Sequence, residues 1–274
     1  MSDLFWVLYR TIVAGLFGLL IGSFLNVCIY RLPRGETIAK GRSYCPRCRH
    51  ELAGADLVPV FSYLLLHKRC RYCSQPIAPR YARIESVTGI YFALAVWLWG
   101  NGPLSPAQDG RPGLFLDWPD PVYNAAVLFC ILLAFCALLV WAMILFDRQI
   151  PPRAIYWFIA LPVLARLALQ PDRLLLHLAA ALFAVAFWWL IHILNLIREE
   201  DRLRRNHITA GFLLLGLITG LFVIQPVMAI LLTMTLLQIL WLDKKQGRSE
   251  QLRSLINALQ PVAVLVGFVF MLFG

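Results

Sequence analysis

Charged side chains are scarce in this sequence: they make up only 15% of its 274 residues, while 60% of the residues are hydrophobic. A soluble domain has about a quarter charged and about half apolar residues. The deficit therefore excludes an ordinary water-soluble domain and indicates a protein that folds in lipid. Internal repeats and low-complexity tracts are also lacking. So is a small-residue cleavage site after the first apolar run, which we therefore interpret as an uncleaved first helix.

Eight apolar segments are long enough, or nearly so, to cross a hydrocarbon layer about 30 Å thick. They predict membrane-spanning helices at residues 5–30, 86–100, 122–146, 154–169, 174–196, 209–223, 226–242 and 256–273. The expected fold is an all-α polytopic membrane protein with about eight transmembrane helices. We divide it into a first helix (1–30), a polar insert (31–85) and a seven-helix membrane domain (86–274).

Basic residues are confined to alternate loops. The insert 31–85 has eleven Lys and Arg, and loops 197–208 and 243–253 have four each, whereas loop 101–121 has only Arg111. Basic short loops stay on the cytoplasmic side of a membrane, so we expect the insert inside and both termini outside. This placement also favours anionic lipid, and not nucleic acid, as the partner of the net charge of +10.

Four of the seven cysteines lie in the insert and form two CxxC pairs, Cys45-Pro-Arg-Cys48 and Cys70-Arg-Tyr-Cys73. Two such pairs suit a tetrahedral Cys₄ zinc site, because each turn presents two thiolates to one metal. Two disulfides or free thiols are the alternatives, and a cytoplasmic location disfavours disulfides. Iron in a rubredoxin-like centre is a further alternative. With four protein ligands a zinc ion has no open position, so its predicted role is to fold a zinc-ribbon-like insert.

Five segments of the N-terminal third share their order and spacing with one known family: GSFLNVCIYRLPRGE (22–36), CPRC (45–48), ADLVPVFSYLLL (55–66), CRYC (70–73) and PIAPRYARIESVTG (76–89). Together with the insert that follows the first helix, they resemble the prepilin leader peptidase/N-methyltransferase family. The resemblance implies a protein of the bacterial inner membrane with periplasmic termini and a cytoplasmic zinc domain. Its implied partners are prepilins or pseudopilins, membrane lipid and components of type IV pilus or type II secretion assembly.

The resemblance also implies two reactions. One is cleavage of the basic leader by two aspartates that share a proton, and the other is methylation of the new N-terminal amine with S-adenosylmethionine. The family's first catalytic Asp lies seven residues before the Pro of a conserved turn, and here that position is Leu145. Asp147 fits it only if two residues are deleted. The family's GxGD motif is missing, with Asn206 and His207 about where Gly-Asp would stand.

The nearest carboxylates to that second position form a charge run that we interpret as a solvated loop: Glu199, Glu200 and Asp201. A lone Asp147 cannot be acid and base at once. We therefore predict that aspartyl cleavage is lost and that Asp147 is the one catalytic candidate left of a degenerate peptidase site.

The methyltransferase region keeps more of the family pattern. Asp56 matches a (D/N)xxP step, and Arg80 and Glu85 match an RYxxxE segment, so the resemblance implies that these three residues bind the cofactor. A salt bridge or loop cap within the insert is the alternative role of each. Lys68 stands where the family has Gly, and we expect Lys to allow neither close backbone approach nor positive φ there.

Three functional hypotheses follow. The first is a diverged family member that has lost its peptidase centre and keeps the zinc domain for prepilin N-methylation or prepilin binding. The second is a non-catalytic assembly factor of a pilus or secretion system. The third is an active leader peptidase that uses Asp147.

Overall fold

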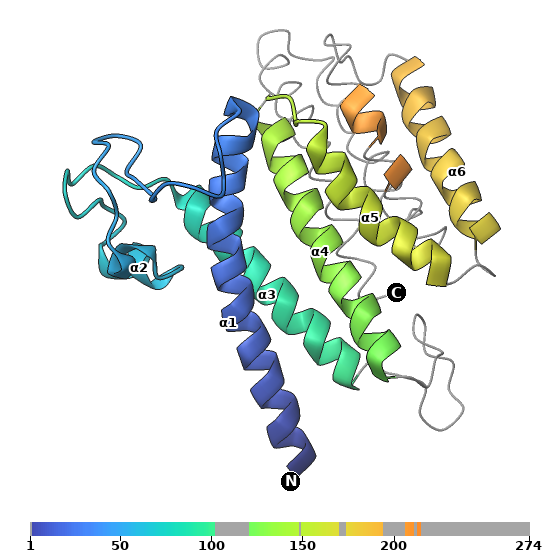
Figure 1. The fold of residues 1–274 in the computed structure, drawn as a ribbon, viewed down its shortest axis with the longest axis horizontal. Coiled ribbons are helices and arrows are strands. Elements are labelled where there is room, and N and C mark those ends of the chain that lie inside the picture. Colours follow the sequence, from blue (N-terminus) through green and yellow to red (C-terminus); the bar gives the residue numbers. More distant parts are fainter. Residues whose placement is uncertain are drawn as a thin grey trace, which may run out of the picture. The chain divides into compact units, whose positions relative to one another are not determined.

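A computed structural model describes residues 2–101, 121–147, 149–169, 174–193, 206–210 and 213–214. Helices are the main regular structure of these residues, which have no strand beyond two isolated bridges, and most of residues 35–78 is loop and turn. The elements are α1 (Ser2–Arg31), η1 (Leu32–Arg34), η2 (Gly54–Leu57), α2 (Phe61–Leu65), α3 (Pro79–Asn101), α4 (Pro121–Phe146), α5 (Ala154–Leu169) and α6 (Leu174–Ile193) (Figure 1). The predicted all-α class is thus confirmed for the described part of the chain.

Two of the described helices are long and apolar enough to cross a membrane. They cover Leu4–Arg34, with mean hydropathy 2.3, and Leu128–Phe146, with mean hydropathy 2.9. The chain is also helical at 86–100, 154–169 and most of 174–196, where the sequence predicts further spans. Of the last three predicted spans, 226–242 and 256–273 lie outside the described residues and 209–223 lies almost wholly outside them, so the number eight stays a prediction.

The chain divides into two compact units, residues 1–124 and 125–274. The first holds α1, the insert and α3. The second holds most of α4 together with α5 and α6.

In the first unit α1 and α3 pack antiparallel over glycines. A Cβ added at Gly18 would lie 2.8 Å from the Phe92 Cβ, and one added at Gly22 would lie 2.7 Å from the Glu85 Cα. Real Cβ atoms do not come so close, so only glycine permits this approach of the two backbones. Small residues at a helix contact are the usual means of close packing in lipid, where no hydrophobic force drives helices together.

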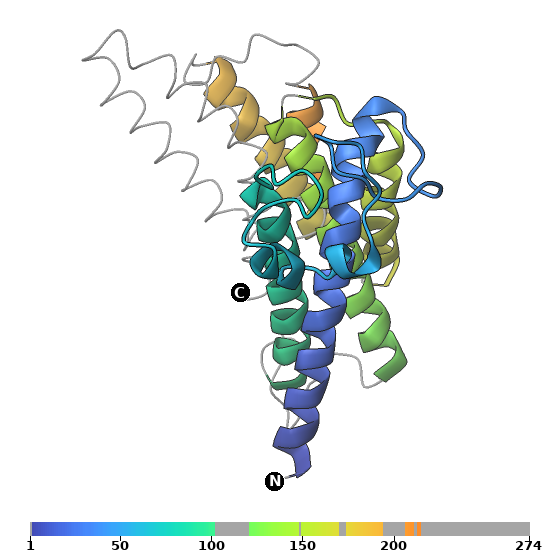
Figure 2. The same ribbon diagram turned by 90° about the vertical axis from the view of Figure 1, so that its left-hand side faces the viewer.

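The insert leaves α1 at Arg31 and folds back along the same helix. In both views α2 lies beside the upper middle of α1 and not beyond its Arg31 end (Figures 1 and 2). The insert therefore lies against the sides of α1 and α3, where polar side chains of both helices can reach it.

In the second unit the C-terminal half of α4 is buried. Trp141, Ile144 and Leu145 are fully enclosed, and in α5 so is Ile159. The indole Nε1 of Trp141 donates to the Tyr156 hydroxyl at 3.2 Å, which joins α4 to α5. This packing determines the surroundings of Leu145.

Candidate functional site

The two CxxC segments have the same backbone fold. In the first, the Cys45 N–H donates to the His50 carbonyl and the Arg49 N–H to the Cys45 carbonyl, both at 2.9 Å. In the second, the Cys70 N–H donates to Gln75 and the Ser74 N–H to Cys70, again at 2.9 Å. The residue after each second cysteine has positive φ, 61° at Arg49 and 56° at Ser74. Each segment is thus a tight knuckle that turns its two thiols to one side.

The four thiols of the two knuckles converge. The Sγ atoms of Cys45, Cys48, Cys70 and Cys73 all lie within 4.8 Å of one another. In a tetrahedral site with Zn–S bonds of about 2.3 Å, the sulfurs would be about 3.8 Å apart. The cluster can therefore hold a metal ion such as zinc after a small contraction, and the donor set is the one that thiophilic metals prefer.

The side chain of Arg31 orders the segment that leads into the first knuckle. Its Nη1 donates to the carbonyls of Thr37 and Lys40, and its Nη2 to that of Arg42, each at 3.1 Å. The residue is buried. A buried guanidinium satisfied by three carbonyls fixes the path of residues 37–42, which have no helix or strand of their own.

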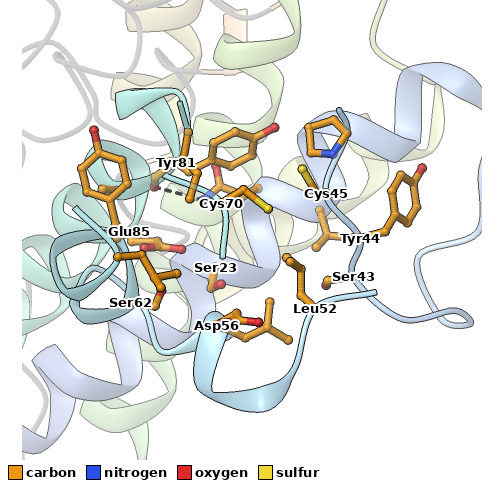
Figure 3. A pocket seen from close by; sticks show the side chains of 18 of the residues that line it. Ser23, Ser43, Tyr44, Cys45, Leu52, Asp56, Ser62, Cys70, Tyr81 and Glu85 are labelled. Carbon is orange, nitrogen blue, oxygen red and sulfur yellow. Dashed lines mark hydrogen bonds between the residues drawn. The ribbon is translucent and has the colours of Figure 1, made fainter. Parts of the chain in front are cut away.

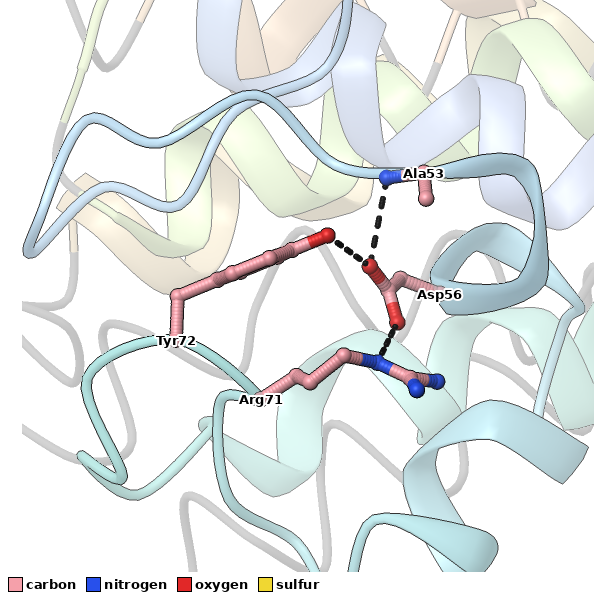
Figure 4. A network of polar contacts seen from close by, with 4 residues as sticks. All are labelled: Ala53, Asp56, Arg71 and Tyr72. Carbon is pink, nitrogen blue, oxygen red and sulfur yellow. Dashed lines mark hydrogen bonds and ion pairs between the residues drawn. The ribbon is translucent and has the colours of Figure 1, made fainter.

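Asp56 joins η2 to the second knuckle (Figure 4). Its Oδ1 accepts from Arg71 Nε at 2.7 Å, and its Oδ2 accepts from the Tyr72 hydroxyl at 3.0 Å and the Ala53 N–H at 3.2 Å. Burial raises the pKa of this carboxyl, but the hydrogen bonds from Arg71, Tyr72 and Ala53 outweigh it and hold the pKa below its usual value. Asp56 therefore acts as a salt bridge and loop cap within the insert.

A cavity of about 200 Å³ lies between the insert and the helices α1 and α3 (Figure 3). Glu85 of α3 and Asp56 of η2 both line it, as do Arg31, Cys45 and Cys70. Most of the remaining lining is apolar or aromatic. Ligand sites combine such walls with a few fixed polar groups, although they usually measure about 300–1,000 Å³. The cavity thus suits a small molecule, or one end of a larger molecule.

Glu85 is a buried carboxylate of the cavity wall, at 9% exposed. Its Oε2 accepts the Val60 N–H at 2.7 Å, and it also interacts with the Ser23 hydroxyl. Val60 has φ 61°, a conformation that is unusual for a β-branched residue, and the bond to Glu85 helps to hold it. Glu85 therefore fixes the start of α2 and places a carboxylate on the cavity wall.

The other predicted residues of this region have mixed outcomes. Arg80 is not among the residues that line the cavity. Lys68 has φ 64°, so our expectation that Lys would not allow positive φ at this position is wrong. The N–H of Lys68 donates to Tyr63 at 2.9 Å and its carbonyl accepts from Ile77 at 2.8 Å, and these two bonds hold the backbone in that conformation.

The sequence analysis missed three polar residues of α1 that line the cavity: Ser23, Asn26 and Arg31. Asn26 is buried, and its Nδ2 donates to the Tyr81 carbonyl at 3.1 Å. The sequence does contain a signal for Ser23 and Asn26. Polar residues three apart within an apolar run lie on one face of a helix and are costly in lipid, which indicates a functional or buried polar face.

In the second unit Leu145, which the resemblance aligns with the family's first catalytic position, is fully buried. Asp147 directly follows the end of α4, and its N–H donates to the Met143 carbonyl at 3.1 Å. His207, near the family's second position, is hydrogen-bonded through Nδ1 to the Tyr156 hydroxyl and stacks on that ring at 5.6 Å. The charge run 199–201 lies outside the described residues.

Comparison with known proteins finds similar sequences for the N-terminal unit. Residues 16–99 match the Bacterial Peptidase A24 N-terminal domain. The chain is 49% identical over 75 residues to the prepilin leader peptidase/N-methyltransferase of Myxococcus xanthus, covering 27% of this chain and 22% of that protein. It is 44% identical over 91 residues to the protein of the same name from Klebsiella pneumoniae, covering 31% of this chain and 40% of that protein. No solved structure matches the chain.

Residues 16–99 are thus a domain of the bacterial A24 peptidase N-terminal class. In this N-terminal region the chain is similar to prepilin leader peptidase/N-methyltransferases. It spans about a fifth to two fifths of the length of the relatives it matches. What those relatives do as whole proteins is therefore carried over only as a proposal.

Proposed function

We propose that this chain binds the N-terminal region of a prepilin or pseudopilin at the insert and methylates its N-terminal amine there, and that it has lost aspartyl leader cleavage. The observation that carries the proposal is the buried Glu85 carboxylate on the wall of a cavity beside the Cys₄ cluster. The relatives' printed names include both activities, and the residues that match them lie in the N-terminal unit.

The proposed setting is the bacterial inner membrane. Eight spanning helices would place both termini in the periplasm and the insert 31–85 in the cytoplasm. The chain would then comprise a first helix (1–30), this insert and a seven-helix domain (86–274). The concentration of Lys and Arg in alternate loops and the two long apolar helices support this arrangement.

In this proposal Cys45, Cys48, Cys70 and Cys73 hold one structural zinc ion. The convergence of their sulfurs and the equal geometry of the two knuckles support it. Zinc would supply folding free energy to an insert with few secondary-structure hydrogen bonds. Because all four positions are filled by protein, the ion would not activate water.

S-adenosylmethionine would supply the methyl group as an electrophile. The cavity fits part of such a molecule, because it offers the Glu85 carboxylate, the Arg31 guanidinium and apolar walls. Glu85 can attract the substrate's amine and take up the proton that the nitrogen loses when its bond to carbon forms. Arg31 also lines the cavity, and its positive charge would favour a carboxylate group there.

The test is mass spectrometry of a prepilin co-expressed with this chain, with cleavage and N-methylation scored separately. A prepilin supplied already cleaved provides the free amine. Wild type should methylate it. Glu85→Gln should lose most of the activity, because the amide still accepts the Val60 N–H but carries no charge. Glu85→Ala, which lacks both features, should also disturb the fold around α2.

Two results would redirect the interpretation. If wild type binds the prepilin without modifying it, the chain is a non-catalytic assembly factor. If wild type cleaves the leader and Asp147→Ala abolishes cleavage, the chain is an active peptidase. Full methylation by Glu85→Gln would contradict the role proposed for this carboxylate.

A further inference from the structure

The insert carries an exposed apolar surface around α2. It is formed by large side chains that are 38–77% exposed, and we call them the α2 patch: Leu57, Val58, Phe61, Leu64 and Leu65. The last three lie on one face of α2, because they are spaced three and four residues apart. Single exposed apolar residues are ordinary, but a cluster of this kind marks a contact surface.

The contacts of Glu85 show how far along α1 and α3 the patch lies. The Val60 N–H, at the start of α2, donates to Glu85, and Glu85 lies directly opposite Gly22 of α1. Gly22 is nine residues before Arg31, or roughly 13 Å at 1.5 Å per residue. The patch therefore lies well below the Arg31 end of α1, as the fold-back of the insert also shows (Figures 1 and 2).

The exposed apolar band of the helices reaches this depth. On α1 the exposed large hydrophobic residues run from Leu4 to Phe24, and none occurs between residues 25 and 34. On α3 the band includes Val87 and Ile90. Since Phe24 lies beyond Gly22 toward Arg31, the start of α2 is level with the last part of the surface that α1 would present to hydrocarbon.

The exposed charges that follow the patch in the chain have one sign. Exposed His67, Lys68 and Arg69 follow α2 directly, and no acidic residue occurs between Asp56 and Glu85. An apolar face bordered by Lys and Arg is the pattern of an interfacial segment, in which the apolar side chains enter the acyl boundary and the cations meet anionic headgroups.

We propose that the α2 patch is a lipid anchor, which lies in the headgroup–acyl boundary of an anionic phospholipid leaflet with Lys68 and Arg69 at the lipid phosphates. The anchor requires that α1 span the membrane and is independent of the chemistry proposed for the cavity. It would hold the cavity at the membrane surface, and so limit its substrates to chains that emerge from the same bilayer.

The first experiment uses the full chain in nanodiscs of phosphatidylcholine and phosphatidylglycerol, with a benzophenone amino acid at position 65. The same group at Leu16, which is 53% exposed on α1, is the positive control, and at Glu51, on the first knuckle, the negative control. Lipid adducts at 65 should approach those at 16 and exceed those at 51 at least tenfold. Adducts at the level of position 51, or chiefly with protein, would overturn the proposal.

The second experiment leaves the patch intact, which guards against a label that disturbs the fold. Hydrogen exchange is followed at the Leu64 and Leu66 amides, which donate within α2 to Val60 and Ser62. In the same nanodiscs the double variant Lys68→Gln/Arg69→Gln should exchange several-fold faster at both amides than wild type. Arg42→Gln, in the segment before the first knuckle, should not. Equal exchange in the double variant and wild type would count against the anchor.

Discussion

Lys68 has φ 64°, in the left-handed region that costs a residue with a Cβ about 1–2 kcal/mol. Replacing it by Gly removes this strain but gives the unfolded chain more freedom, at a cost of about 0.5–1 kcal/mol. We predict that Lys68→Gly stabilises the insert by up to about 1 kcal/mol. The measurement is the rate of metal transfer to a chelator, in a neutral detergent so that lost lipid contacts do not contribute.

Lys40→Gly serves as the control for this prediction, because Lys40 is not among the residues with positive φ. It should slightly destabilise the insert. If Lys68→Gly releases metal faster than wild type, the strain assigned to position 68 is wrong.

The second prediction concerns the hydrogen bonds of Asp56. Asp56→Asn should loosen the second knuckle and release metal several-fold faster, since the carboxylate is 3% exposed and serves Arg71, Tyr72 and the Ala53 N–H together. Glu51→Gln is the matched control. It removes one acid from an ion pair with Arg42 in which both side chains are exposed, and such pairs contribute little.

The effect of pH on this contact has a definite sign. Because the folded pKa of Asp56 lies below its usual value, the stabilisation is complete above the unfolded pKa of about 3.9 and is lost as pH falls through the folded pKa. The ratio of release rates for Asp56→Asn and wild type should therefore be the same at pH 6 and pH 8. A ratio that changes between them would show that another group controls this contact.

At the scale of elements, the two knuckles depend on each other. We predict that Cys70→Ser abolishes stoichiometric metal binding and unfolds the insert while α1 and α3 stay in the membrane. The helices are held by their own contact over Gly18 and Gly22, whereas the insert has only short helices of its own and depends on the metal site to join its two knuckles. Elemental analysis and proteolysis of residues 35–78 measure the two effects.

Cys28→Ser is the control, because Cys28 lies within α1 and outside the cluster. It should keep the metal. A wild-type protein without stoichiometric metal, or a Cys70→Ser protein that retains it, would refute the site.

The α1–α3 contact gives the next prediction. Gly22→Val should separate the helices and displace the insert, because even a Cβ would come within 2.7 Å of the Glu85 backbone. Overpacking of this kind costs about 1–3 kcal/mol or more. Gly15→Ala, whose added Cβ would meet Ala93 at an ordinary 3.4 Å, should be tolerated. Thermal stability in detergent compares the two variants, and equal melting of both would refute the close contact.

These elements differ in how far the sequence predicts them. CxxC spacing determines local geometry, so the four-thiol cluster could be predicted without the fold. The cavity could not, because it depends on the register of α1 against α3 and on the fold-back of the insert, both tertiary features. For that reason the sequence indicated Glu85 and Asp56 but not Asn26 or Arg31, and it named Arg80, which does not line the cavity.

For the whole molecule, the implied chemistry is divided between the units. The residues matched to methylation lie in the first unit, and those matched to cleavage lie in the second. In the proposed function the cleavage centre is lost without disturbing the insert, because each unit has its own packing. This division would allow one activity to be kept without the other.

The last prediction is that the protein does not cleave a prepilin leader in a reconstituted assay, and that Asp147→Ala behaves like wild type there. Amide hydrolysis needs a base to take a proton and an acid to give one, each contributing about 10²–10⁴-fold. The position aligned with the family's first catalytic Asp is the fully buried, apolar Leu145. His207 is hydrogen-bonded to the Tyr156 hydroxyl, so neither residue supplies the acid that would pair with Asp147. Asp147→Asn provides a variant with the same shape, should Asp147→Ala fold poorly. Cleavage by wild type that is abolished by Asp147→Asn and by Asp201→Asn would restore a working pair of carboxylates.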